Sequence, residues 1–146
     1  MNNPDFQPAG KHTVTCYLIL PDVPLLIDFV QTVFDGTLSF MLNRPDGKIM
    51  HAEIKIGDTI IMAGTSSNAF EISPGGLFIY VRDCDLTFKK ALARGAVEIM
   101  PPTTMYHAGE RYGGVKDQNG NVWWIATHQE DLTPDEQKRR ILENNP

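Results

Sequence analysis

The sequence lacks the features that define several specialised classes of protein. It has only two cysteines, Cys16 and Cys84, in dissimilar contexts and without the Cys-x-x-Cys spacing of a metal or redox site. We therefore expect both to be reduced, small core residues. There is no run of about 18 apolar residues for a membrane helix, and no basic and then apolar leader for export. These absences make the cytoplasm the expected location.

Positive charge is also scarce. The 146 residues include 13 Lys and Arg against 18 Asp and Glu, a formal net charge of -5. An acidic chain is a poor match for polyanions, which argues against nucleic acid and anionic membrane as main partners. The single basic cluster, Lys138-Arg139-Arg140, is flanked by acids and predicts a solvated helix face. Hydrophobic residues make up 42% and charged residues 21%, as in one compact soluble domain or two small halves that share a core.

The first half of the chain predicts one helix and four strands. Residues 1–11 contain Pro4, Pro8 and Gly10 and are expected to form a flexible arm. Asp22 is placed to cap the helix, with Pro24 in its first turn, where a missing N–H costs little. The expected elements are strand 13–20, helix 25–34, and strands 37–42, 48–56 and 59–63.

The same pattern returns after a polar connection, residues 64–75. The expected elements there are strand 77–81, helix 84–94 capped by Asp83, and strands 97–100, 111–116 and 121–127. Residues 57–63 also resemble residues 120–126 directly. A duplicated unit cannot bury its apolar surface alone, so the copies should pack together. The sequence predicts an α+β domain over residues 12–128, made of βαβββ units at about 12–64 and 75–128. A tail, residues 129–146, follows with a helix that begins at Thr133-Pro134.

The stretch from Gly113 to Thr127 contains the most specific local signal. Asp117-Gln118-Asn119-Gly120 between two β-prone runs predicts a hairpin, because Asn and Gly tolerate the positive φ of such turns. The second run contains the only two tryptophans of the chain, Trp123 and Trp124. Neighbours on a strand point to opposite faces, so Trp123 is expected in the core and Trp124 on the other side of the sheet.

Two βαβββ units, the second ending in Tyr112-Gly113-Gly114-Val115-Lys116-Asp117 and Gly120-Asn121-x-Trp, resemble the vicinal oxygen chelate superfamily. That superfamily contains glyoxalases, extradiol dioxygenases, and fosfomycin- and bleomycin-resistance proteins. Further motifs are similar to its PhnB-like, glyoxalase-related subgroup: Tyr17-Leu18-Ile19 before Pro21-Asp22, His51-Ala52-Glu53-Ile54 before Gly57-Asp58, and Arg111-Tyr112-Gly113. The resemblance implies curved mixed sheets that enclose a cleft, and pairing into a homodimer. It identifies a fold rather than a reaction.

The resemblance also implies where a metal would bind. Metal-dependent members carry a histidine or carboxylate on the first and last strand of each unit. The matching positions here are Thr15, Ile61 or Met62, Gly76 and Trp124, or, one residue along, Cys16, Leu77 and Ile125. These lack the three or four His, Asp, Glu or Cys ligands that a borderline cation requires. We therefore expect no metal, no other cofactor, and no conventional glyoxalase I or dioxygenase site.

Residues 48–56 alternate between apolar and polar side chains. Met50, Ala52, Ile54 and Ile56 form one face, and Ile49, His51, Glu53 and Lys55 form the other. The polar face is expected toward the cleft. His51 and Glu53 would then lie together as a proton-transfer pair and are the candidate catalytic residues. The competing interpretation is a solvated strand face that carries an incidental pair.

Aromatic side chains are the candidate substrate-binding groups. Tyr17, Phe78, Tyr112 and Trp124 are expected to line the implied cleft, although such rings also serve simply as core. Arg111 is a candidate for binding an anionic substrate, or it lies on the face opposite Tyr112. His128 ends the last strand and is expected at the rim.

The leading hypothesis is a metal-independent member of this superfamily that binds a small organic molecule in an aromatic cleft, with possible lyase or isomerase chemistry at His51 and Glu53. The first alternative is a non-catalytic protein that sequesters a drug or metabolite, as the resemblance to bleomycin-resistance proteins implies. The second alternative is a divalent-metal-dependent lyase or dioxygenase with displaced ligands from His51, Glu53 and His128.

Overall fold

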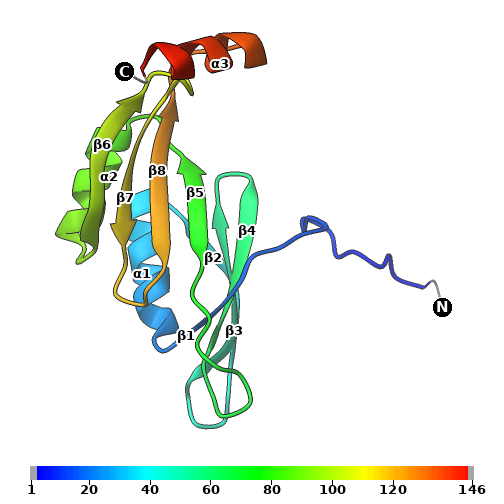
Figure 1. The fold of residues 1–146 in the computed structure, drawn as a ribbon. Coiled ribbons are helices and arrows are strands. Elements are labelled where there is room, and N and C mark those ends of the chain that lie inside the picture. The colour runs from blue at the N-terminus through cyan, green and yellow to red at the C-terminus, as the bar shows by residue number, and fades with distance from the viewer. Residues whose placement is uncertain (1–2, 145–146) are drawn as a thin grey trace. The chain divides into compact units, whose positions relative to one another are not determined.

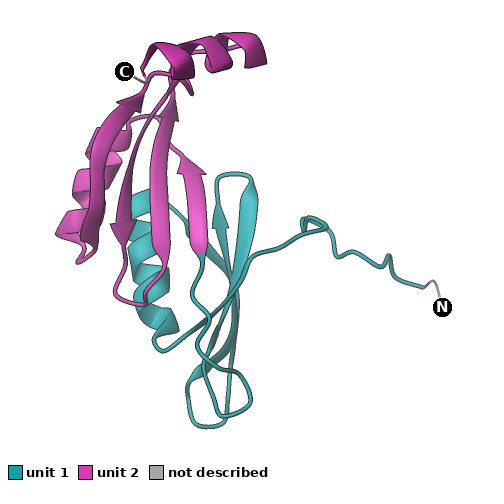
Figure 2. Cartoon of the chain, in the orientation of Figure 1, with its two compact units in different colours: residues 1–75 teal, residues 76–146 magenta. Residues whose placement is uncertain are grey.

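A computed structural model describes residues 3–144 and shows an α+β protein with two compact units, residues 1–75 and 76–146 (Figures 1 and 2). Each unit contains a four-stranded mixed sheet and one helix, and a third helix follows near the C-terminus. The predicted class, two tandem βαβββ units plus a C-terminal helix, is confirmed. Within residues 3–144, no helix is long and apolar enough to span a membrane.

The first unit consists of a sheet with strand order β1-β4-β3-β2 and the helix α1. Its elements are β1 (Tyr17–Leu20), α1 (Val23–Phe34), β2 (Thr37–Asn43), β3 (Ile49–Ile56) and β4 (Thr59–Thr65). β1 runs parallel to β4, and the other neighbours are antiparallel. The apolar stripe of α1, including Leu26, Phe29 and Val30, is buried together with the sheet residues Ala52 and Ile54. This packing supplies the core of the unit.

The second unit repeats this architecture, with strand order β5-β8-β7-β6. Its elements are β5 (Gly76–Tyr80), α2 (Cys84–Ala93), β6 (Val97–Met105), β7 (Glu110–Lys116) and β8 (Val122–His128), followed by α3 (Pro134–Glu143). β5 is parallel to β8, as β1 is to β4. The core of this unit contains Phe88 of α2 together with Val115, Trp123 and Ile125 of the sheet. The matching strand orders confirm the duplication read from the sequence.

The helix starts follow from capping side chains, as predicted. The Asp22 carboxylate accepts a hydrogen bond from the Leu25 N–H at 3.0 Å, and the Asp83 carboxylate accepts one from the Leu86 N–H at 3.0 Å. The Thr133 hydroxyl accepts the Glu136 N–H at 3.2 Å. Each side chain satisfies a donor that the first turn of a helix leaves without a partner.

Two strand boundaries differ from the prediction by more than two residues. The first strand begins at Tyr17 rather than at residue 13, because its ladder with β4 starts at the pair Tyr17 and Met62. β6 continues to Met105 rather than ending at Met100, although it contains Pro101 and Pro102. β6 is an edge strand, where a missing N–H is tolerated, and its register shifts between Met100 and Thr103.

The start of β3 also departs from simple alternation. The pairs change from Leu42 with His51 to Asn43 with Ile49, so one extra residue of β3 lies between them. This bulge leaves Met50 48% exposed and Ile49 buried, the reverse of their predicted faces. From His51 onward the alternation is as expected.

The hairpin between β7 and β8 is organised by the carboxylate of Asp117. Its Oδ1 accepts the N–H groups of Asn119 and Asn121, both at 2.9 Å. Its Oδ2 accepts the side-chain amide of Asn121 and the indole N–H of Trp123, also at 2.9 Å. Gly120 has φ 88°, as the predicted turn requires. The buried carboxylate therefore fixes both the turn and the core tryptophan that follows it.

The predicted solvated face of the last helix is wrong for Arg140. This side chain is 9% exposed, and it pairs with Glu130 and Glu136. Its guanidinium lies 4.3 Å from the centre of the Tyr106 ring. Arg139, its neighbour in sequence, is 53% exposed, as the prediction implied.

Candidate functional site

An aromatic face covers the side of the second sheet opposite α2. We give this name to Phe78, Tyr80, Tyr112 and Trp124, which come from β5, β7 and β8. The ring centres of Phe78 and Tyr112 are 5.4 Å apart, those of Tyr112 and Trp124 6.2 Å, and those of Phe78 and Tyr80 5.4 Å. The rings meet edge to face, an arrangement that aromatic quadrupoles favour. Phe78 is nevertheless 47% exposed, so the face is accessible.

A glycine on the neighbouring strand leaves room for the indole of Trp124. Gly114 is its partner on β7, and a Cβ atom added there would lie 2.4 Å from Cζ3 of the indole. Any larger residue would therefore displace the ring. Trp123, one residue earlier, is 1% exposed and lies in the core. The predicted division of the two tryptophans between opposite faces is confirmed.

A polar cluster adjoins the aromatic face at Tyr80. The Tyr80 hydroxyl donates to Glu110 Oε1 at 2.9 Å, and His128 Nδ1 lies 3.7 Å from the same oxygen. His128 Nε2 is 2.8 Å from Asp131 Oδ1, and this hydrogen bond raises the pKa of His128. Sequence reasoning placed His128 at the end of the last strand, as the bounds of β8 confirm, but it missed Tyr80 and Glu110. Their pairing joins β5 to β7, a contact between residues 30 positions apart that no local pattern encodes.

Arg111 lies on the α2 side of the sheet, opposite Tyr112. Its Nε and Nη2 donate to the two carboxylate oxygens of Asp85, each at 2.8 Å. This fork lowers the pKa of Asp85 to about 2. Of the two alternatives for Arg111, the arrangement supports the one that places it away from the aromatic face.

The first unit brings together the predicted pair on β3. His51 Nε2 lies 3.2 Å from Glu53 Oε1, and Lys11 Nζ lies 2.9 Å from Glu53 Oε2. The contact with Lys11 lowers the pKa of Glu53, so the carboxylate is ionised at neutral pH. The ring of Tyr17 stacks on His51 with centres 5.9 Å apart, and that of Phe40 lies at 6.1 Å. Sequence reasoning missed Lys11, which is 42 residues away, and Phe40, whose partner across the β2–β3 ladder is Glu53.

The same fold occurs in known proteins. The model of the glyoxalase/bleomycin resistance protein/dioxygenase superfamily matches residues 11–125. The chain belongs to this superfamily. It is 28% identical over 131 residues to the uncharacterised protein Rv0887c of Mycobacterium tuberculosis, covering 82% of this chain and 76% of that one.

Solved structures share this fold. Protein PA1353 of Pseudomonas aeruginosa superimposes with a TM-score of 0.68 at 24% identity, covering 82% of this chain and all of that one. A PhnB protein of Bacillus cereus superimposes with a TM-score of 0.65 at 18% identity, covering 80% of this chain and 99% of that one. At these identities the likeness establishes the fold only.

The metal implied by the superfamily resemblance does not fit the residues present. Thr15 precedes β1, and the residues in register on the first and last strands are Tyr17 with Met62 and Phe78 with Trp124. None offers an imidazole or carboxylate. Across residues 3–144, no three His, Cys, Asp or Glu residues group so that they could hold a metal ion. The positions expected to carry ligands, among them Met62, Gly76 and Trp124, therefore lack the groups that such a metal requires.

Proposed function

We propose that this superfamily member binds a small planar organic molecule on the aromatic face of its second unit, without the usual metal. The observation that carries the proposal is the contact of the exposed ring of Phe78 and the half-buried rings of Tyr112 and Trp124 on the side of the sheet that α2 does not cover. The core of the unit lies on the other side, around Trp123. Rings that are not needed for that core, and that adjoin a polar cluster, are typical of a ligand site.

The proposal requires binding but no chemical step on the aromatic face. Tyr112 and Trp124 present hydrocarbon ring surface, and neither is a good base or nucleophile at neutral pH. The superfamily to which the chain belongs includes bleomycin resistance proteins. A protein that sequesters a drug or metabolite therefore fits this face as well as an enzyme does.

The test is the substitution of Trp124 by alanine. A buried tryptophan contact with a ligand is worth about 2 kcal/mol, so the affinity for a bound planar molecule should fall roughly 10- to 30-fold. Acridone, a neutral fluorescent tricycle, serves as the probe, and its fluorescence anisotropy is measured against protein concentration. Phe70→Ala is the matched control, because Phe70 is an exposed aromatic residue of the first unit. Unchanged affinity in Trp124→Ala, or an equal loss in Phe70→Ala, would contradict the proposal.

A second candidate function is proton transfer by His51 and Glu53 in the first unit, as in an isomerase or lyase. The 3.2 Å contact with Glu53 favours a proton on His51 Nε2, which leaves Nδ1 with the lone pair of a base. Glu53 orients the ring and stabilises the imidazolium that forms on proton uptake. Lys11 keeps Glu53 ionised for this role. The stacked ring of Tyr17 holds the imidazole in place.

Exchange of substrate protons with solvent tests this second candidate. A panel of small α-hydroxy ketones and 2-oxo acids is incubated with the protein in D₂O, and loss of the carbon-bound proton signal next to the carbonyl is followed by NMR. Enzyme-dependent exchange is expected, and Glu53→Gln should slow it about 100-fold, because the imidazolium that forms at His51 loses its charged partner. Glu98→Gln changes an exposed carboxylate in β6 and should leave the rate unaltered. Equal rates in the wild type and Glu53→Gln would remove Glu53 from the mechanism.

A further inference from the structure

The polar cluster beside the aromatic face gives that face a chemical preference. We propose that it selects planar organic cations, such as N-alkylated heteroaromatic rings, and that Glu110 is the group that balances the charge of the ligand. This inference rests on the proposed binding function and specifies the class of ligand.

The carboxylate of Glu110 is held in a fixed place. It lies on β7, and its side chain is 16% exposed. The hydroxyl of Tyr80, a residue of the aromatic face, donates to Oε1, and His128 Nδ1 lies 3.7 Å from the same oxygen. Among residues 3–144, both contacts fall on Oε1, which leaves Oε2 for a group outside the chain. A fixed carboxylate with one available oxygen is a ready acceptor for a cation or an N–H donor.

Negative charge dominates this end of the face. The groups that meet there are Glu110 on β7, His128 at the end of β8, and Asp131 in the segment that follows. His128 lies closer to Asp131, at 2.8 Å, than to Glu110, at 3.7 Å. With His128 protonated, the three groups still sum to one negative charge, and with His128 neutral they sum to two.

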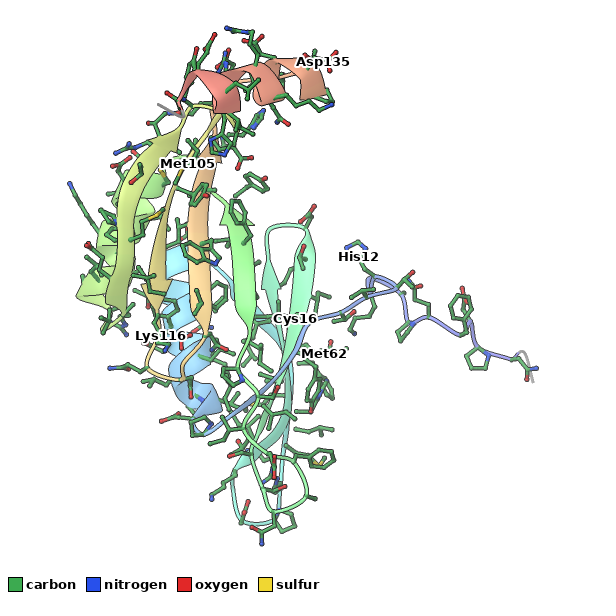
Figure 3. All side chains as sticks on the ribbon, in the orientation of Figure 1. His12, Cys16, Met62, Met105, Lys116 and Asp135 are labelled. Carbon is green, nitrogen blue, oxygen red and sulfur yellow. The ribbon has the colours of Figure 1, made fainter. Side chains whose placement is uncertain are left out.

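Two arginines of the second unit and the lysine of β7 are held away from Glu110. Arg111 lies on the α2 side in its fork with Asp85, and Arg140 is held by Glu130 and Glu136. Lys116 ends β7 at the opposite end from Glu110 and Met105 (Figure 3). Six residues of strand separate Lys116 from Glu110, a distance of roughly 20 Å, at which exposed charges are largely screened.

The aromatic rings, like the carboxylate of Glu110, favour a positively charged ligand. The faces of Trp, Tyr and Phe rings carry partial negative charge and attract a cation that lies over them. Tyr80 connects the two features, because its ring packs against Phe78 with centres 5.4 Å apart while its hydroxyl holds Glu110. A planar cation could therefore stack on the rings and place its positive edge toward Glu110. A planar anion would meet repulsion from both.

The test compares two probes of the same shape with the full-length protein. N-methylacridinium carries a fixed positive charge, and acridone is neutral, so the ratio of their dissociation constants isolates the effect of charge. The wild type is expected to bind the cation roughly fivefold more tightly at low salt. Glu110→Gln, which keeps an acceptor for Tyr80, should remove most of this preference while acridone affinity stays the same. Glu98→Gln removes the same charge from an exposed position in β6, outside the aromatic face and its polar cluster, and should keep the preference for the cation.

Cation preference that disappears in Glu110→Gln and persists in Glu98→Gln supports the proposal. Equal binding of both probes by the wild type, or an unchanged preference in Glu110→Gln, overturns it and leaves ligand binding by the aromatic face intact. Failure of the wild type to bind either probe overturns both the selectivity and the proposed function.

Discussion

Replacement of Asp117 by alanine is expected to lower the free energy of unfolding by about 3 kcal/mol or more. The buried carboxylate accepts four hydrogen bonds at 2.9 Å, from the N–H groups of Asn119 and Asn121, the side chain of Asn121 and the indole of Trp123. Each hydrogen bond to a charged group contributes about 1.5 to 3 kcal/mol, and donors left buried without acceptors add a further penalty. Partial rearrangement and entry of water keep the total below the sum of the four.

Urea denaturation followed by tryptophan fluorescence measures this effect, because Trp123 is itself one of the donors. The matched control is Asp58→Ala in the β3–β4 turn of the first unit. There the carboxylate is exposed and, among the described residues, accepts one hydrogen bond, from the hydroxyl of Thr59 at 3.0 Å, so a change within about 0.5 kcal/mol is expected. A third variant, Asp117→Asn, keeps the shape but turns an N–H₂ group toward donors and should also destabilise the fold. Equal stability of the two alanine variants would show that the Asp117 network is not what holds the hairpin.

The features that sequence reasoning predicted are the ones that neighbouring residues determine. Asp22 and Asp83 cap helices that start within three residues of them, and Trp123 and Trp124 take opposite faces because adjacent strand residues must. The paired His51 and Glu53 follow from the same period of two. Local geometry leaves little freedom in these cases, so the pattern is sufficient.

The sequence-based predictions are wrong where residues distant in the sequence determine the local structure. Ile49 and Met50 exchange faces because a bulge opposite Asn43 inserts one residue, and alternation within a single strand cannot reveal a bulge. Pro101 and Pro102 continue β6 because that strand is at an edge, which depends on the order of the whole sheet. The partners that complete each candidate site, Lys11 and Glu110, reach it across long stretches of chain.

The role of Arg140 in attaching α3 is likewise set by residues distant in the sequence. Arg140→Ala should release α3 from the second unit. Among the described residues of α3, Arg140 alone is buried, so the helix lacks an apolar stripe with which to pack. The guanidinium instead binds Glu130 through two bonds of 2.8 and 2.7 Å and donates to the Tyr106 carbonyl at 2.9 Å.

Hydrogen exchange of the amides in α3 measures this release. Their protection is expected to fall roughly tenfold or more in Arg140→Ala, because loss of docking leaves a ten-residue helix that is too short to be stable alone. Arg139→Ala is the matched control, because it removes the same side chain one residue earlier. Arg139 pairs at the surface with Glu136 and Glu143 of the same helix, so its loss should change protection by less than about twofold. Arg140→Lys keeps the charge but loses the fork to Glu130, so its protection should lie between the two. Both variants remove a contact with Glu136 within the helix. An equal loss of protection in Arg139→Ala and Arg140→Ala would therefore mean that contacts within the helix, rather than docking through Arg140, protect the amides of α3.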